Sequence, residues 1–263
     1  MIYLDEQFSV LWKDKDPFDA AWHLEGQVFR SVETRKTLRF SINETGFYIK
    51  RHQGVQIKEI LKNICQLRMP VLGARNEFNA IQKLRDLNVL TMEVAAFGEE
   101  EKNILTRKSF IVTKEIAPAI SLEDYCKKWK ERPDYIELKR EIIKIVAESV
   151  RKMHQGGVNH RDCYLCHFLM KMPILKTPQI FVIDLHRAQI RKKVPIRWRN
   201  KDLIGLYYSS MYIGLKGTDY IRFLKEYFKN EDLWIVFDRE RELIRSINYR
   251  AKEIEERTKR RGL

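Results

Sequence analysis

The sequence predicts an α+β fold with two lobes, a small β-rich N-lobe over residues 1–115 and a larger helical C-lobe over residues 116–263. Strand-like alternation and turn residues are concentrated in the first part of the chain, and helical spacing of apolar residues dominates the second. No internal repeat or low-complexity linker separates the two parts. We therefore expect one continuous domain, which 263 residues are long enough to build.

The expected elements of the first part begin with a β-hairpin. Residues 37–42 alternate in character, residues 43–46 are turn residues, and residues 46–50 form the return strand. Two helices are expected next, over residues 57–64 and 78–85, because apolar side chains recur there at helical spacing. Short apolar runs then predict buried strands, at residues 94–97 and 110–113.

The second part is expected to be mainly helical. Residues 138–153 repeat apolar side chains at helical spacing, and Gly156 and Gly157 end that helix. A short strand is expected over residues 180–183, directly before Asp184. Three further helices are expected after it, over residues 202–215, over residues 220–228, and from Glu231 to the basic residues 259–261.

The charge of the chain favours an anionic partner. Fifty Lys and Arg against 36 Asp and Glu give a formal net charge of +14. Nucleic acid, an acidic membrane surface, a phosphorylated glycan and an acidic protein would all suit this charge. No RNA-binding signature, zinc-finger spacing or Arg-Gly-rich tail is visible, so we do not expect nucleic acid.

The N-terminus does not resemble an export signal. Asp5 and Glu6 are acidic where a secretory signal is basic, and no long apolar core follows them. The longest apolar runs, residues 180–183 and 233–237, are too short to cross a bilayer. We expect a cytoplasmic protein.

Residues 159–169, NHRDCYLCHFL, carry the patterns of several chemistries at once. Cys163, Cys166 and His167 have the spacing of a c-type haem attachment site, and the two cysteines alone have that of a redox dithiol. The HRD triplet at residues 160–162, with a polar ligand type at position 167, is typical of the catalytic loop of a protein-kinase-like phosphotransferase.

The cysteine-based interpretations are less favoured. Covalent haem attachment takes place outside the cytoplasm, and no export signal is visible. A zinc site would need His160, Cys163, Cys166 and His167 to converge, but four ligands crowded into eight positions do not readily face one tetrahedral centre. Buried thiols that pack the loop against a core are the simpler interpretation.

Phosphoryl transfer requires positioned charges, and the chain has a candidate for each in the expected order. Asp162, in a loop after a helix, is the candidate base that takes the proton of the acceptor hydroxyl. Asp184, at the end of an apolar strand, is the candidate magnesium ligand. Lys50 is the candidate phosphate-binding lysine. Glu77 opens a helix on the face of its apolar residues and is the candidate partner of that lysine.

The sequence resembles the bacterial lipopolysaccharide core heptose(I) kinases. The resemblance is carried by the long motifs NHRDCYLCHFL (residues 159–169) and VIDLHRAQ (residues 182–189). Shorter motifs extend it over most of the chain: LRF at 38–40, MPVLGA at 69–74, SLEDY at 121–125 and WRNKDL at 198–203. The resemblance implies a protein-kinase-like fold. It also implies ATP-dependent phosphorylation of the first heptose of the lipopolysaccharide inner core, with the heptose 4-hydroxyl as the expected acceptor.

Two departures from ordinary protein kinases affect the expected site. His167 stands where an asparagine usually helps to bind the second metal, and a neutral imidazole is a softer substitute. No glycine-rich loop is present, and residues 33–37 stand in its place. We therefore expect Arg35 or Lys36 to cover the ATP phosphates.

Three further residues complete the expected site. Arg161 is expected to orient the catalytic loop through charge-assisted hydrogen bonds. Asp202 is expected to hold the backbone of that loop. Glu59 remains a rival to Glu77 as the partner of Lys50.

The expected cofactors are ATP and Mg²⁺, and the expected partner is the lipopolysaccharide inner core. A basic surface suits peripheral contact with the cytoplasmic face of the inner membrane, to which Trp234, Phe237 and residues 259–261 would contribute. It would suit an acidic protein such as acyl carrier protein equally well. Two alternatives stay open. One is a kinase of another acceptor, such as 3-deoxy-manno-octulosonic acid (Kdo), a small molecule or protein tyrosine, and the other is a catalytically silent binding protein.

Overall fold

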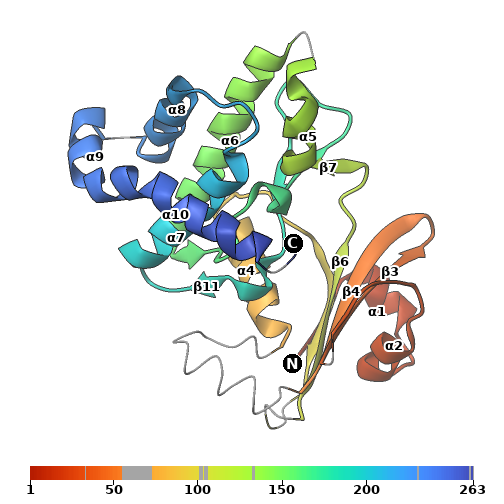
Figure 1. The fold of residues 1–263 in the computed structure, drawn as a ribbon. Helices are drawn as coiled ribbons and strands as arrows, with labels where there is room; N and C mark the ends of the chain where they lie inside the picture. The colour runs from red at the N-terminus through yellow and green to blue at the C-terminus, as the bar shows by residue number, and fades with distance from the viewer. Residues whose placement is uncertain are drawn as a thin grey trace. The chain divides into compact units, whose positions relative to one another are not determined.

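The chain divides into two units, each with its own buried core (Figure 1). Unit 1 comprises residues 1–82, 91–117 and 185–187, and unit 2 comprises residues 83–90, 118–184 and 188–263. The computed structural model describes the following residues: 1–32, 34–54, 73–100, 103, 106–131, 134–229, 231–260 and 262. The expected helix over residues 57–64, the rival Glu59, Cys65 and the motif residues 69–72 lie outside the described residues.

Unit 1 is built on a six-stranded antiparallel sheet with the order β1-β5-β6-β4-β3-β2. The expected hairpin is confirmed, and its two strands are longer than predicted. Asn43 and Glu44 close its turn by adopting the left-handed conformation. The two expected buried strands are also confirmed. The elements are β1 (Ile2–Leu4), α1 (Glu6–Leu11), α2 (Pro17–His23), β2 (Gln27–Val32), β3 (Arg35–Ile42), β4 (Thr45–Gln53), α4 (Arg75–Asp86), β5 (Val94–Glu99) and β6 (Lys108–Lys114).

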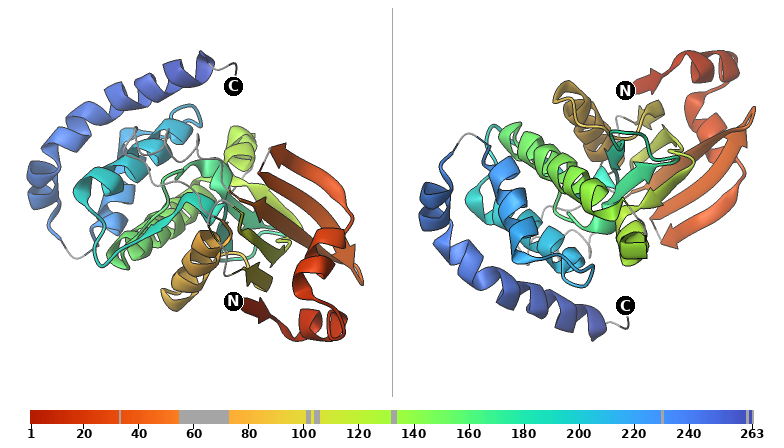
Figure 2. Two further views of the ribbon diagram at one scale, coloured as in Figure 1. Left: turned by 90° about the horizontal axis from the view of Figure 1, so that it is seen from below. Right: turned by 90° about the horizontal axis from the view of Figure 1, so that it is seen from above.

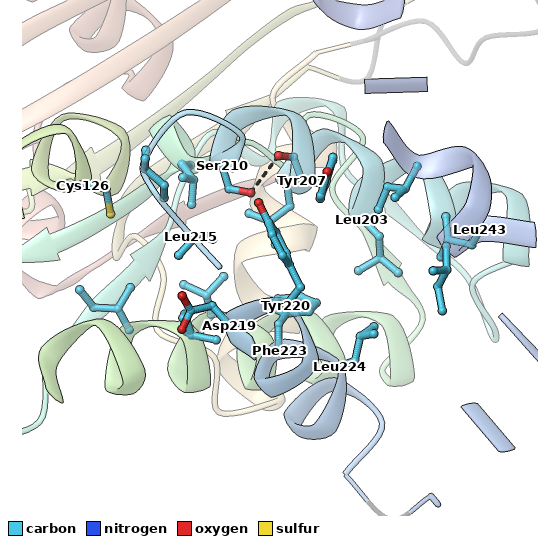
Figure 3. A pocket seen from close by; sticks show the side chains of 18 of the residues that line it. Cys126, Leu203, Tyr207, Ser210, Leu215, Asp219, Tyr220, Phe223, Leu224 and Leu243 are labelled. Carbon is cyan, nitrogen blue, oxygen red and sulfur yellow. Dashed lines mark hydrogen bonds between the residues drawn. The ribbon is translucent and has the colours of Figure 1, made fainter. Parts of the chain in front are cut away.

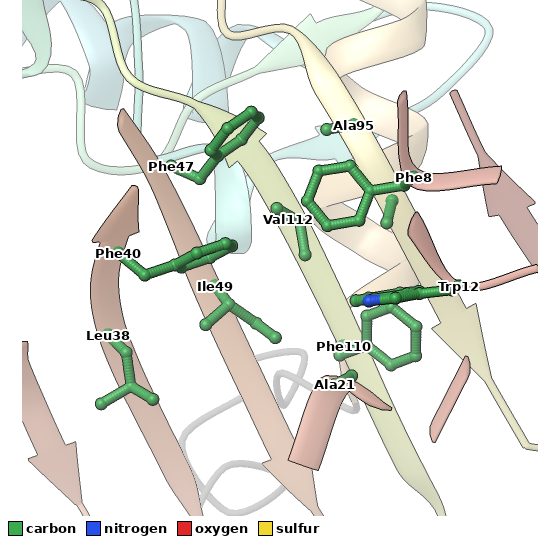
Figure 4. Close-up of a cluster of buried hydrophobic side chains, with 11 residues drawn as sticks. Phe8, Trp12, Ala21, Leu38, Phe40, Phe47, Ile49, Ala95, Phe110 and Val112 are labelled. Atoms are coloured by element: carbon green, nitrogen blue, oxygen red, sulfur yellow. The ribbon is translucent and has the colours of Figure 1, made fainter. Parts of the chain in front are cut away.

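One face of this sheet packs against α1 and α2 through an aromatic core (Figure 4). Phe8 of α1 contacts Phe47 of β4 edge to face, with ring centroids 5.4 Å apart. Each fully buried phenylalanine contributes about 1.5–3 kcal/mol, so the cluster holds both helices on the sheet. The sequence prediction missed these helices, although Asp5 and Asp16 cap them by accepting backbone N–H groups.

Lys50 belongs to the other face of the sheet. Successive residues of a strand point to opposite faces, and Ile49 faces the aromatic core. Lys50 does not end its strand, as the sequence suggested, because β4 continues to Gln53. The helix predicted over residues 78–85 is α4, and its Glu77 meets Lys50.

Unit 2 is mainly helical, with short strands near its loops (Figure 2). The helix expected over residues 138–153 is confirmed as α6, which ends where Gly157 takes a left-handed conformation. The elements are β7 (Ala119–Ser121), α5 (Leu122–Lys128), α6 (Tyr135–Gln155), β8 (Val158–Asn159), β9 (Phe168–Lys171), β10 (Ile180–Val182), β11 (Gln189–Ile190), α7 (Ile196–Ser210), α8 (Gly217–Tyr227), α9 (Leu233–Arg239) and α10 (Arg241–Lys259).

Two helix predictions in unit 2 were wrong in their bounds. The helix expected from residue 202 begins at Ile196, directly after Pro195, whose fixed φ suits a helix start. The single helix expected from Glu231 is two helices, α9 and α10, which meet at Glu240. Glu240 is buried and accepts a hydrogen bond from Arg199 at 2.9 Å, and this contact fixes the break. Within the described residues, no helix is long and apolar enough to cross a membrane.

Candidate active site

The loop after β8 is held by a buried aspartate from α7. Asp202 accepts the backbone N–H of His160 at 2.7 Å and that of Arg161 at 2.8 Å. Both N–H groups are buried, so without the carboxylate they would lack a partner. The expectation that Asp202 holds this loop is confirmed.

A second layer fixes Asp202 itself. His154 Nε2 lies 3.2 Å from Asp202 Oδ2, and His154 Nδ1 lies 2.7 Å from the hydroxyl of Tyr227. Because a carboxylate only accepts, Nε2 donates its N–H to Asp202, and Nδ1 then accepts the phenol proton. Burial raises the pKa of Tyr227, which keeps that proton in place. The sequence prediction missed both residues, because their contact joins positions far apart in the chain.

Arg161 takes a backbone conformation that a non-glycine residue rarely adopts. Its φ is +73°, and Asp184 is the other residue of this loop region in the same state, with φ +59°. The Arg161 side chain is buried, and its guanidinium lies 5.8 Å from the ring centroid of Trp198. Strained positions of this kind are held in place by their surroundings and are common at functional sites. Arg161 is thus bound to Asp202 through its backbone N–H and contacts Trp198 through its side chain.

The strand pair β9–β10 brings His167 and Asp184 together. Val182 lies opposite Phe168 in this antiparallel pair, so the residue before β9 and the residues after β10 lie at the same end. His167 Nε2 is 3.6 Å from Asp184 Oδ2. His167 Nδ1 donates to the backbone carbonyl of Asp162 at 2.6 Å. When the His167 ring is neutral and Nδ1 carries its proton, Nε2 has a free lone pair, and this nitrogen is the one that lies near the Asp184 carboxylate.

Asp162 shares this part of unit 2. Its carbonyl accepts both the His167 ring N–H and the backbone N–H of Tyr164, at 2.6 and 2.9 Å. These bonds fix the turn while the side chain stays partly exposed. Asp162, His167 and Asp184 therefore form one polar group of unit 2.

Neither cysteine of the loop has the properties of a reactive thiol. Burial raises the pKa of Cys163 far above its ordinary value and that of Cys166 to about 11. Both thiols stay protonated near neutral pH, whereas a redox dithiol requires the thiolate. Among the described residues, no group of three or more His, Cys, Asp or Glu is placed to hold a metal ion. The zinc interpretation is therefore wrong, and loop packing accounts for the two cysteines.

In unit 1, Lys50 of β4 pairs with Glu77 of α4. Lys50 Nζ lies 2.7 Å from Glu77 Oε1. The Glu77 side chain is 1% exposed and that of Lys50 is 20% exposed. The structure thus brings these two predicted residues together. It does not test Glu59, which lies outside the described residues.

Replacing Lys50 with Met is expected to lower the free energy of unfolding by about 3 kcal/mol, because it leaves the Glu77 carboxylate buried without its cation. The double variant Lys50→Met/Glu77→Gln should regain most of that loss, since it removes the stranded charge as well. Urea denaturation of the three proteins measures the difference. A double variant no more stable than Lys50→Met would contradict the pairing.

The start of β3 separates the two predicted phosphate-covering residues. Arg35 lies opposite His52, and Lys36 lies opposite Arg51. Cross-strand partners share a face, so Arg35 lies on the face of Lys50 and His52, while Lys36 lies on the other. The structure thus brings Arg35, and not Lys36, to the same side as Lys50.

His52 is a member of this face that the sequence prediction missed. It lies two residues after Lys50, which is the spacing that puts two strand residues on one face. The ring is buried, and its Nε2 has no hydrogen-bond partner in the described part of the chain. Burial lowers the pKa of His52 to about 3, with further contributions from Arg35, Lys50 and His186. His52 is therefore neutral in the folded protein.

This buried histidine is expected to make stability fall on acidification. The unfolded chain binds the proton with a pKa near 6.5, and the folded chain binds it only near 3, so protons favour unfolding below pH 6.5. Between pH 7 and pH 5 the loss from His52 is about 2 kcal/mol. Urea denaturation at both pH values should show a loss smaller by that amount in His52→Leu. An equal loss in both proteins would contradict a neutral buried His52.

Unit 2 also contains a partly open apolar cavity of about 180 Å³ (Figure 3). Its walls come from α5, α6, α7, α8 and α10. Leucine, isoleucine and aromatic side chains make up most of the lining, with Asp219 and Ser210 among the few polar members. Burial raises the pKa of the thiol of Cys126, another wall residue, to about 12. Such a cavity suits an apolar ligand.

A solved structure of similar fold defines the class of protein to which this chain belongs. A solved structure described as WaaP in complex with acyl carrier protein superposes with a TM-score of 0.84 at 40% identity, covering 96% of this chain and 98% of that one. With its antiparallel sheet, helical unit and aspartate-held loop, the chain has a protein-kinase-like fold, as the sequence predicted.

The family follows from sequence. The model of the "Lipopolysaccharide kinase (Kdo/WaaP) family" matches residues 19–227, and the chain belongs to this family. Two Escherichia coli proteins, each named lipopolysaccharide core heptose(I) kinase WaaP, are 51% identical to it over all of both chains. A protein of that name from Pseudomonas aeruginosa is 44% identical over 99% of this chain and 98% of its own. The chain is thus a kinase, an ATP-dependent phosphotransferase, and the family resemblance is confirmed.

Proposed function

We propose that this kinase phosphorylates the first heptose of the lipopolysaccharide inner core, at the 4-hydroxyl. The observation that carries the proposal is the 51% identity, over the full length of both chains, to proteins named heptose(I) kinases. An inner-core acceptor also agrees with the net charge of +14, since the inner core carries phosphates and acidic sugars.

In this proposal the reaction is a transfer of the γ-phosphoryl group of ATP. The heptose oxygen forms a bond to the γ-phosphorus, the bond from that phosphorus to the bridging oxygen breaks, and ADP leaves. Asp162 takes the proton of the heptose hydroxyl. Arg161 positions the turn that carries Asp162, and Asp202 holds that turn through two backbone N–H groups.

Residues of unit 1 would bind the nucleotide. Lys50 would hold the phosphates, and Glu77, which contacts it at 2.7 Å, would keep its ammonium in place. Arg35 is favoured over Lys36 as the additional phosphate ligand, because Arg35 shares the sheet face of Lys50. Arginine suits this task because its planar guanidinium binds phosphate oxygens in pairs.

Asp184 would hold Mg²⁺ through its carboxylate, and His167 would add an imidazole, a softer donor than the oxygen ligands that Mg²⁺ prefers. One carboxylate oxygen and one imidazole lone pair face each other at 3.6 Å, and the His167 N–H is already used on a carbonyl. Mg²⁺ is commonly bound by one or two protein ligands, with water and substrate phosphates completing its shell. When bound, the ion would neutralise charge on the β- and γ-phosphates.

Substitution at His167 tests its part in metal binding. His167→Ala is expected to raise the Mg²⁺ concentration for half-maximal transfer by about tenfold or more, because it removes one donor. His167→Asn should cost less, since an amide oxygen is a donor that Mg²⁺ prefers. It should also lower the ratio of Co²⁺-supported to Mg²⁺-supported rates. Unchanged metal dependence in both variants would remove His167 from the metal site.

Phosphoryl transfer to defined acceptors tests the proposed function. Purified protein, ATP and core-truncated lipopolysaccharides are incubated, and the products are fragmented by mass spectrometry. We expect one added phosphate on the first heptose, and no transfer to an acceptor that ends in Kdo. Transfer to Kdo alone, which the family description also names, would replace the heptose assignment.

Acyl carrier protein and the membrane are the proposed partners. The structural relative is described in complex with acyl carrier protein, and the apolar cavity of unit 2 is suited to an acyl chain. Acylated carrier protein should therefore co-migrate with this chain in size-exclusion chromatography, and the unacylated form should do so less. An acceptor linked to lipid would bring the kinase to the cytoplasmic face of the inner membrane.

A further inference from the structure

A groove rich in positive charge lies at one end of the helices of unit 2, and its volume is about 630 Å³. The last turn of α6, the start of α7 and the end of α8 line it, together with residues at both ends of α9. Among the described residues that line it, Glu231 is the one carboxylate. The cationic lining residues are Arg151, Lys192, Lys193, Arg199, Lys229 and Arg239.

The arginines of this cationic groove are partly neutralised, and its three lysines are not. Arg199 donates to Glu240 at 2.9 Å, and Arg239 donates to Glu240 at 3.0 Å. Lys192, Lys193 and Lys229 are exposed, and none of the three has an ion pair within the described part of the chain. The available positive charge of the groove therefore lies largely on these three lysines, of which Lys192 and Lys193 are adjacent in the chain.

Exposed apolar side chains lie on the groove and on α9, the helix that ends at its lining residue Arg239. Ile196, the first residue of α7, lines it and is 67% exposed. On α9, Trp234 is 82% exposed and Ile235 is 61% exposed. Ile235 precedes Arg239 by four residues, so both lie on one side of the helix. α9 lies at the outer edge of unit 2 (Figures 1 and 2).

We propose that the cationic groove and its apolar border, Ile196, Trp234 and Ile235, form the surface on which the kinase docks to an anionic lipid bilayer. The proposal rests on the proposed function, because a lipid-linked acceptor lies at such a surface. Lys192 and Lys193 meet anionic headgroups. Trp234 enters the interfacial layer, where its ring is apolar and its indole N–H still reaches water.

A bilayer fits this surface better than an acidic protein does. An acidic protein supplies charge for the lysines but requires no large exposed apolar groups around them. The bilayer interface supplies anionic headgroups and, a few ångström deeper, an apolar layer. Stable attachment at an interface takes two weak signals together, and the groove and its border supply both. Because exposed charges are screened by salt, binding should weaken as ionic strength rises.

Vesicle sedimentation of the full-length chain tests the proposal. We expect it to sediment with vesicles of equimolar phosphatidylglycerol and phosphatidylcholine, and to bind phosphatidylcholine alone far more weakly. Lys192→Glu/Lys193→Glu should weaken binding to the anionic vesicles by about 30-fold or more, given the contribution of each surface lysine. Trp234→Ala/Ile235→Ala should weaken it too, and the remaining binding should keep its salt dependence.

Matched control variants show whether binding depends on this surface or only on the net charge and on any exposed aromatic residue. Lys13→Glu/Lys15→Glu changes the charge equally on exposed lysines of unit 1, and Tyr249→Ala removes a comparably exposed aromatic of α10. Both should bind like wild type. Loss of binding in these controls to the same degree, or wild-type binding in the groove variants, would overturn the proposal. So would loss of acyl carrier protein binding in the groove variants while vesicle binding persists.

A lipid-free acceptor keeps the two proposals distinct. All groove variants should phosphorylate a deacylated core oligosaccharide at the wild-type rate, because none of the changed residues belongs to the candidate active site. If the wild-type protein transfers phosphate normally but does not bind vesicles, the proposed docking surface is wrong and the proposed function stands. If the wild-type protein binds vesicles but transfers no phosphate, the proposed function is wrong and the proposed docking surface stands.

Discussion

Asp162→Asn is expected to lower the rate of phosphoryl transfer by about 10²–10⁴-fold, the usual contribution of a general base. The amide keeps the shape of the side chain but cannot take the proton of the acceptor hydroxyl. Its backbone carbonyl, which binds His167 and Tyr164, is unaffected by the change. Initial rates with ATP and a heptose-bearing acceptor measure the effect.

Two controls make the Asp162 result specific. The thermal midpoint of Asp162→Asn should match wild type, because the side chain is partly exposed. Asp14→Asn, an equal change at an exposed aspartate of unit 1, should leave the rate unchanged. A rate for Asp162→Asn within a few-fold of wild type would rule out Asp162 as the base.

Asp202→Ala is expected to destabilise the protein and to stop transfer. Two buried backbone N–H groups and the His154 N–H lose their acceptor, which costs about 3–5 kcal/mol. The loop that carries Asp162 loses its anchor at the same time, so kcat should fall even where the protein remains folded. Urea denaturation and steady-state kinetics measure the two effects.

Asp202→Asn separates anchoring from charge. Its single amide oxygen can replace only one of the two carboxylate oxygens, so one of the N–H groups of His160 and Arg161 loses its partner. The free energy of unfolding of Asp202→Asn should therefore lie between that of wild type and that of Asp202→Ala. If Asp202→Ala had wild-type kcat and stability, the loop would not depend on this aspartate.

The sequence was sufficient for features whose position is set by local order. The β3–β4 hairpin follows from alternation and turn residues, and Asp162, His167 and Asp184 lie in motifs whose order along the chain already indicates phosphoryl transfer. The spacing of Phe78, Ile81 and Leu84 placed Glu77 correctly on the inner side of α4. These features depend on neighbours within a few residues, which a sequence pattern contains.

Other features depend on contacts between distant residues. The break between α9 and α10 lies at Glu240, whose partner Arg199 is 41 positions away. The contact of His154 with Tyr227 spans 73 positions and has no local signature. The separation of Arg35 from Lys36 follows from the register of β3 against β4, which a list of charges does not contain.

Mass spectrometry of the inner core from cells with and without this protein tests the central claim most directly. The claim is that the kinase adds one phosphate to the first heptose. Cells that lack the protein should lose one phosphate at that sugar, wild-type protein supplied in trans should restore it, and Asp162→Asn should not. An inner core that keeps its first-heptose phosphate without the protein, or that loses a phosphate only elsewhere, would contradict the claim.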